Sequence, residues 1–174
     1  YISPEMQKMM PAIAKAGGDM TKVNGDSLFP VLNMLNAKYF IVPLQANQTV
    51  AIENPYVYGN AWFVDKVTYV KNANEELDTL GKLNLRHEAV ADARFQSQLG
   101  ESKNQDSTSI VKLTAYEPNQ LTYDVRSATG GIVVFSEIFY PEWTATVDGK
   151  PVEIGRVDYV LRALNVDKGH HKVV

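Results

Sequence analysis

Two glutamates lie five positions apart in the segment SEIFYPEW, residues 136–143. Glu137 and Glu142 are of the type that glycoside hydrolases use as an acid and base pair, which requires the two carboxyl groups to lie roughly 5–10 Å apart. A strand and its exit do not fix that separation. A soluble glycoside hydrolase is therefore the least favoured of the functional hypotheses below.

Glu137 also has a structural interpretation. It lies within the apolar run GGIVVFSEIFYP, residues 130–141, where an ionised carboxylate needs a partner. Arg162, in the later segment YVLRAL, is the natural candidate across a sheet. We favour a structural ion pair between Glu137 and Arg162 over a catalytic role.

Three aromatic residues could offer faces to a sugar ring: Tyr140, Trp143 and Tyr159. Trp143, however, alternates in phase with Ala145 and Val147, which is typical of one face of a strand. We therefore expect Trp143 to pack between two antiparallel sheets, with its indole N–H bonded to a backbone group. Pro141 would end the preceding strand and turn the chain. Glycan contact is the alternative interpretation.

Other chemistry finds little support in the sequence. Asp148 and Gly149 form a two-residue hairpin signal, and a calcium site would need further oxygen ligands nearby. The adjacent His170 and His171 would point to opposite faces of a strand and could not chelate one ion. Cysteine is absent, and the phosphate-loop, dinucleotide and nucleophile-elbow patterns do not occur. We expect no catalytic residue, no cofactor and no metal ion.

Composition argues against a nucleic-acid partner and against a membrane-spanning helix within these residues. The 174 residues carry a net charge of −3, with both signs spread along the sequence. A basic patch interleaved with aromatic residues is missing, so we expect no nucleic-acid partner. The apolar runs all fall short of the roughly 18–20 residues that a membrane helix requires.

The order of the elements predicts an α+β fold. In residues 1–97 we expect a helix from Ser3 to the glycines at 17 and 18, which Pro11 should kink or restart, and a second helix over 27–35. Strands at 38–44 and 49–53 should form a hairpin, followed by a strand at 61–70 and a capped helix after Asn72. Residues 87–93 fit either a helix or a strand.

Residues 110–174 have a different pattern, with short alternating segments separated by turn signals. This favours an antiparallel β-sandwich, jelly-roll-like, in which the run from 130 to 141 is the central strand because it is apolar on both faces. The polar run 98–109 would be a linker between this sandwich and the smaller N-terminal helical and α/β portion. Alternatively, residues 38–70 belong to the same continuous domain.

Four segments together resemble the C-terminal soluble part of the YfhO-like bacterial membrane proteins: LNMLNAKYFIV (32–42), NPYVYGNAWFV (54–64), SEIFYPEWTATVDGKPVEI (136–154) and DYVLRALNVDKGHHKVV (158–174). The combination S-E-x-x-Y-P-x-W, then D-G-K, then R-A and G-x-H carries the likeness. Glu142 departs from it, since the family usually has glycine after the proline.

The resemblance implies a domain on the extracytoplasmic face of a bacterial cell membrane, within a polytopic protein related to the glycosyltransferases that use lipid-linked sugars. The catalytic acidic residues of that class lie in loops between N-terminal membrane helices, so none maps onto this chain. We therefore expect a non-catalytic fragment that acts as a scaffold or positions an acceptor. Its expected partners are the membrane-embedded remainder of its own chain and an envelope glycan or lipid-linked sugar.

Whether the parent protein is an active glycosyltransferase stays open at this point. Both ends of the sequence look cut, which agrees with a fragment. A free-standing carbohydrate-binding module is the alternative function.

Overall fold

The chain divides into two compact units, one up to Gly59 and one from Asn60 to Val174. The computed structural model describes residues 2–43, 48–104 and 107–174. The expected boundary at the polar run 98–109, of which residues 105–106 lie outside the described part, is not where the units divide. The reason is that strand β3 (Ala61–Val64) pairs with β8 (Gly131–Ile138), which joins residues on both sides of that run in one sheet.

The first unit begins with the expected helix, α1 (Ile2–Lys15), which contains Pro11 and ends before two glycines with positive φ. A short 3-10 turn, η1 (Met20–Lys22), follows. The helix expected over 27–35 is instead two short helices, α2 (Gly25–Leu28) and α3 (Pro30–Met34). They are separated at Phe29, whose φ of −145° and ψ of 53° are not helical, and the proline then occupies the first helical position.

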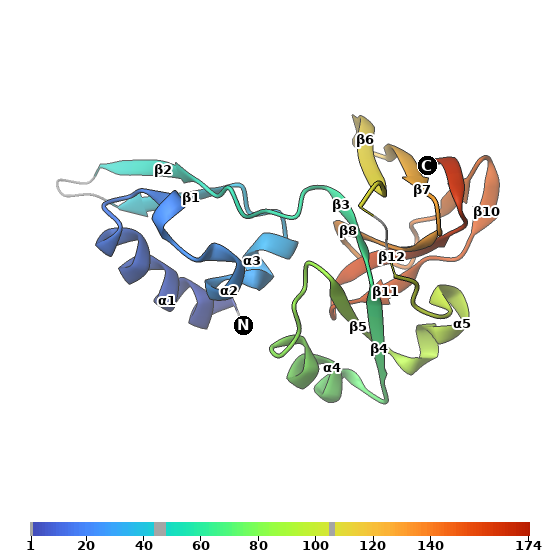
Figure 1. Ribbon diagram of the computed structural model, residues 1–174, viewed down its shortest axis with the longest axis horizontal. Helices are drawn as coiled ribbons and strands as arrows, with labels where there is room; N and C mark the ends of the chain where they lie inside the picture. The colour runs from blue at the N-terminus through green and yellow to red at the C-terminus, as the bar shows by residue number, and fades with distance from the viewer. Residues whose placement is uncertain (1, 44–47, 105–106) are drawn as a thin grey trace. The chain divides into compact units, whose positions relative to one another are not determined.

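A hairpin completes the first unit (Figure 1). Strands β1 (Tyr39–Pro43) and β2 (Thr49–Glu53) pair antiparallel, which confirms the expected hairpin; residue 44 of the expected segment lies outside the described residues. Phe40 is buried, and its ring meets that of Phe29 edge-on at 5.5 Å. Glu5 of α1 ties the helices together, because its carboxylate accepts from the backbone N–H groups of Val31 and Leu32.

The second unit contains the expected β-sandwich, and the protein is an α+β fold. A five-stranded antiparallel sheet has the order β10-β9-β13-β7-β6, and a four-stranded antiparallel sheet has the order β11-β12-β8-β3. The strands not yet bounded are β6 (Ile110–Glu117), β7 (Gln120–Ser127), β9 (Ala145–Val147), β10 (Lys150–Val152), β11 (Gly155–Val157), β12 (Leu161–Val166) and β13 (Gly169–Val173).

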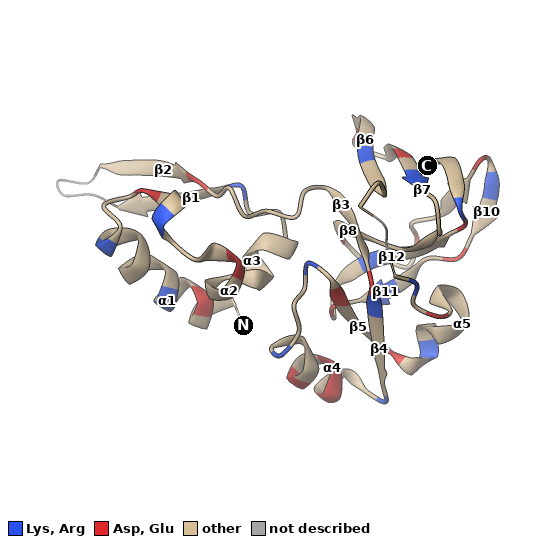
Figure 2. Ribbon diagram, viewed as in Figure 1, with Lys and Arg blue, Asp and Glu red and all other residues tan. Residues whose placement is uncertain are grey.

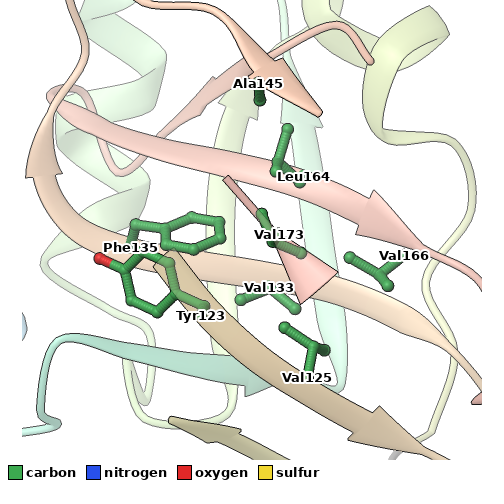
Figure 3. Close-up of a cluster of buried hydrophobic side chains, with 8 residues drawn as sticks. All are labelled: Tyr123, Val125, Val133, Phe135, Ala145, Leu164, Val166 and Val173. Carbon is green, nitrogen blue, oxygen red and sulfur yellow. The ribbon is translucent and has the colours of Figure 1, made fainter. Parts of the chain in front are cut away.

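The core of the sandwich is a cluster of buried side chains contributed by both sheets (Figure 3). Strand β8 contributes Val133 and Phe135 to it, while its alternate residues Ile132 and Val134 are fully buried on the other face. Strand β8 lies between β12 and β3 in its sheet. Its expected place as a central strand, apolar on both faces, is therefore confirmed.

A further group of elements packs against the four-stranded sheet. It consists of the parallel pair β4 (Lys66–Val70) and β5 (Glu88–Asp92), helix α4 (Ala73–Leu80), the turn η2 (Ala93–Phe95) and helix α5 (Gln96–Leu99). The strand expected over 61–70 thus breaks at Asp65, and the ambiguous segment 87–93 is a strand. Helix α4 has the expected Asn72 cap, whose side chain accepts from the N–H groups of Asn74 and Glu75.

Asp158, in the turn between β11 and β12, fastens this group to the sandwich. Its backbone N–H donates to the carbonyl of Val90 at 2.7 Å, and its carboxylate accepts from the Val90 N–H at 2.9 Å. Beside it, the fully buried Glu76 of α4 accepts from Arg156 and from the N–H of Tyr159. Burial, reinforced by the negative charge of Glu76, raises the pKa of Asp158 to about 8.

Asp158 should make the protein lose stability as pH rises. In the unfolded chain an aspartate titrates near about pH 4, so between that value and about pH 8 the folded protein binds a proton that the unfolded chain does not. The free energy of unfolding should therefore fall through this window, by about 1.4 kcal/mol per pH unit at most from this residue.

Asp158→Asn keeps an oxygen for the Val90 N–H and removes the titration. We expect its stability to exceed that of the native protein at pH 8 and to depend less on pH between 5 and 8, as measured by urea unfolding. Parallel pH profiles for the two proteins would show that Asp158 titrates normally.

Candidate functional site

A pocket of about 500 Å³ opens at one end of the sandwich, between the two sheets. Strands β7 and β13 of one sheet and β8 and β12 of the other line it, together with the connection from Tyr140 to Thr144. Its inner wall continues the core, since Phe135, Leu164 and Val173 belong both to the buried cluster and to the pocket lining (Figure 3). The pocket is thus an extension of the apolar interior toward solvent.

The Glu137–Arg162 pair lies at the wall of this pocket. Arg162 Nη2 is 3.2 Å from Glu137 Oε2, so the expected ion pair is present. Each residue is two positions from a core side chain of its own strand, Phe135 on β8 and Leu164 on β12. The pairing of these two strands shifts register between Leu161 and Arg162. Burial lowers the pKa of Arg162, which the negative charge of Glu137 opposes. The pair keeps a guanidinium charged at the edge of an apolar core.

The expected core position of Trp143 is wrong. Its side chain is only half-buried and lines the pocket together with the acidic residues Glu137 and Glu142. The guanidinium carbon of Arg162 lies 4.4 Å from the centre of the indole ring, a cation–π contact. Trp143 is therefore part of the pocket wall and does not fill the space between the sheets.

The cause of this error is local backbone structure. The alternation of Trp143 with Ala145 and Val147 holds only from Ala145, where strand β9 begins. Trp143 itself belongs to a turn, in which its backbone N–H donates to the carbonyl of Tyr140 at 3.1 Å. Pro141, expected to turn the chain, lies in that turn with the exposed Glu142. A residue in a turn need not follow the period of the strand after it.

The three candidate sugar-contacting aromatic residues are not brought together. Tyr140 is 59% exposed and lines the pocket with Trp143. Tyr159 is outside the pocket lining, on the turn between β11 and β12, where its ring lies 5.4 Å from the guanidinium carbon of Arg156. Only Tyr140 and Trp143 therefore share a site.

Two buried polar atoms at this pocket were missed by the sequence analysis. Among the described residues, neither the hydroxyl of Tyr123 nor Nε of Arg162 has a hydrogen-bond partner, and both side chains line the pocket. Tyr123 is 3% exposed and Arg162 is 8% exposed. Tyr123 alternates with Leu121 and Val125 on β7. This pattern predicts a core residue but does not indicate whether its hydroxyl finds a hydrogen-bond partner.

The remaining candidates have structural roles. Asp148 and Gly149 form the expected hairpin turn between β9 and β10, with φ of 52° and 77°. Asp148 also contacts His171 Nδ1 at 2.7 Å, which lowers the pKa of Asp148 and raises that of His171, while His170 contacts a different carboxylate, Asp124. Within the described parts of the chain, no cluster of three or more side chains suited to a metal ion occurs.

Lysines and arginines are interspersed with acidic residues in both units (Figure 2). None of the helices in residues 2–43, 48–104 and 107–174 has the length and apolar character needed to cross a membrane.

Comparison with known proteins gives no relative: no family model, no curated protein and no solved structure matches this chain.

Glu137→Ala should lower thermal stability, because it leaves the buried guanidinium of Arg162 without its counter-charge. We expect the Tm of the second unit to fall by about 5 °C. Glu142→Ala is the matched control: it removes an exposed carboxylate from the same pocket and should shift the Tm by less than about 1 °C. Glu137→Ala with Arg162→Met should recover part of the loss. Equal Tm values for Glu137→Ala and the native protein would show that the pair adds no stability.

Proposed function

We propose that this chain is a non-catalytic extracytoplasmic domain of a bacterial envelope membrane protein, and that its sandwich pocket holds a glycan and positions it for a membrane-embedded partner region. The observation that carries the proposal is the position of Trp143 and Tyr140, whose rings line an open pocket beside charged groups. Aromatic rings with nearby hydrogen-bonding groups are a common arrangement for sugar binding, because a sugar ring has both apolar C–H faces and hydroxyl edges.

The polar side chains of the pocket suit hydroxyl groups. Glu137 and Glu142 supply acceptors, Arg162 supplies donors, and Asn119 and Gln120 supply both. One face of the Trp143 ring is in contact with Arg162, so its orientation is fixed before a ligand arrives. A pre-oriented ring loses less conformational entropy on binding.

The segments that carry the resemblance to the YfhO-like proteins supply most of this pocket. Segment 136–154 contributes Glu137 and the aromatic turn, and segment 158–174 contributes Arg162 and part of the inner wall. The resemblance and the candidate site therefore concern the same residues, which supports an envelope function related to glycan transfer.

The hairpin of the first unit supports the scaffold part of the proposal. Tyr39 and Ile41, on one face of β1, are 62% and 73% exposed, while Phe40 on the other face is buried. Large apolar side chains uncovered on one face of a hairpin are what a docking segment presents. We propose the membrane-embedded remainder of the parent protein as its partner.

A free-standing carbohydrate-binding module remains the alternative. A soluble glycoside hydrolase stays the least favoured hypothesis, although one observation favours it: Glu137 and Glu142 line the same pocket. Against it, Arg162 engages the carboxylate of Glu137 directly. The hydrolase hypothesis requires hydrolysis of a bound glycan that is lost in both Glu137→Gln and Glu142→Gln. Binding without hydrolysis by the native protein would eliminate it.

Trp143→Ala should weaken glycan binding by about tenfold or more, because truncating a central aromatic contact typically costs about 2 kcal/mol. The measurement is isothermal titration calorimetry with the tightest ligand from an array of bacterial envelope oligosaccharides. Tyr159→Ala is the matched control, since that ring lies outside the pocket, and it should bind as the native protein does. An array without any bound glycan, or equal losses in the two variants, would contradict the proposal.

A further inference from the structure

The inner half of the pocket differs chemically from its mouth. Leu121, Phe135, Leu164 and Val173 form apolar walls from both sheets, whereas Tyr140, Glu142 and Trp143 line the pocket from the connection at 140–144. A sugar ring alone presents hydroxyl groups on its whole edge, and these would be left without partners against such walls. The inner half therefore suits an apolar group.

That apolar region contains two hydrogen-bond donors without an acceptor. The hydroxyl of Tyr123 and Nε of Arg162 are covered from solvent and have no partner among the described residues. The Tyr123 oxygen points away from the valines of the core cluster, at the free end of the ring (Figure 3). Buried polar groups in proteins are nearly always hydrogen-bonded, so two unpaired groups lining one pocket indicate that a ligand supplies the partner.

The missing partner must be an acceptor. A guanidinium N–H can only donate, and burial raises the pKa of Tyr123 to about 12, so its hydroxyl keeps its proton at physiological pH. The oxygen that suits both groups is a strong acceptor that can take two hydrogen bonds, and ether and hydroxyl oxygens are weaker acceptors. Carbonyl, carboxylate and phosphate oxygens meet this requirement.

The charge of the pocket selects among these acceptors. Its charged side chains are Glu137, Glu142 and Arg162, two negative and one positive. Arg162 is already paired with Glu137, so an anionic ligand would meet the unpaired charge of Glu142 without a free cation. A neutral carbonyl oxygen avoids that repulsion.

We propose that the inner half of the pocket binds a neutral acyl group, with its carbonyl oxygen accepting from Tyr123 and Arg162 and its alkyl chain lying against the apolar walls. An ester or an amide provides this chemistry. The proposal deepens the glycan-binding function and rests on it, because an acylated sugar would place its ring at Trp143 and its acyl group inside. Acyl binding can nevertheless be measured without any sugar.

The test is calorimetry on the 174-residue chain with four probes of equal chain length, all below micelle-forming concentration: 1-octanoylglycerol, N-octanoyl ethanolamine, 1-O-octylglycerol and octanoate. The first two have a neutral carbonyl, the third replaces it by an ether, and the fourth is an anion. We expect the ester and the amide to bind about tenfold more tightly than the ether and the anion, and the tighter of the two identifies the linkage.

Tyr123→Phe should abolish that preference, since it removes only the hydroxyl. It should not lower the Tm of the free protein, because the lost hydroxyl has no partner there. Tyr116→Phe, at a tyrosine that is 68% exposed on β6, is the matched control and should keep the preference.

Four results would overturn the proposal: no binding by any probe, equal binding of ester and ether, tightest binding of octanoate, or an unchanged preference in Tyr123→Phe. Failure of the glycan proposal is distinguishable, because it appears as equal affinity of native protein and Trp143→Ala for oligosaccharides without acyl groups. The acyl preference is read out at the hydroxyl of Tyr123, which the glycan proposal does not use, so either result can occur without the other.

Discussion

The contacts of Arg162 are the constraint on which the rest of this structure depends. Arg162 is 8% exposed and lies at the end of an apolar core, so the charge of its guanidinium must be compensated. Glu137 provides the counter-charge at 3.2 Å, and the ring of Trp143 covers the guanidinium at 4.4 Å. The turn before β9 places Trp143 outside the core, and these two contacts hold its ring and the guanidinium together at the wall of the pocket.

The fold supplies that position from elements far apart in the sequence. Strand β8 is apolar on both faces up to Phe135, and Glu137 follows as the next residue on the face toward the second sheet. Strand β12 brings Arg162 beside it with a shift in register. On the opposite face, Asp158 and α5 fasten the remaining elements to the four-stranded sheet, since Asp158 bonds Val90 and Asn165 donates to the carbonyl of Leu99. The pocket is lined instead by the strands of both sheets and by the connection from Tyr140 to Thr144.

Sequence patterns predicted the fold and the ion pair well, because period, turn chemistry and charge balance are local or pairwise properties. The central strand, the Asp148–Gly149 turn, the β1–β2 hairpin and the Glu137–Arg162 pair all follow from them. The site was predicted less well. Whether Trp143 follows the strand after it depends on where β9 begins, and a preceding turn decided that. Whether the hydroxyl of Tyr123 has a hydrogen-bond partner depends on residues from other parts of the chain that surround it. The alternation of residues along one strand carries no information about them.

The most direct test of this account is the solvent accessibility of Trp143. The chain has two tryptophans, so Trp62→Phe leaves the indole of Trp143 as the single reporter. If that ring lies at the mouth of the pocket, its fluorescence should be quenched by added acrylamide, and Arg162→Met should change both its emission and its quenching. If the emission is that of a deeply buried indole, resistant to acrylamide and unaffected by Arg162→Met, then Trp143 lies in the core, and the open pocket does not exist.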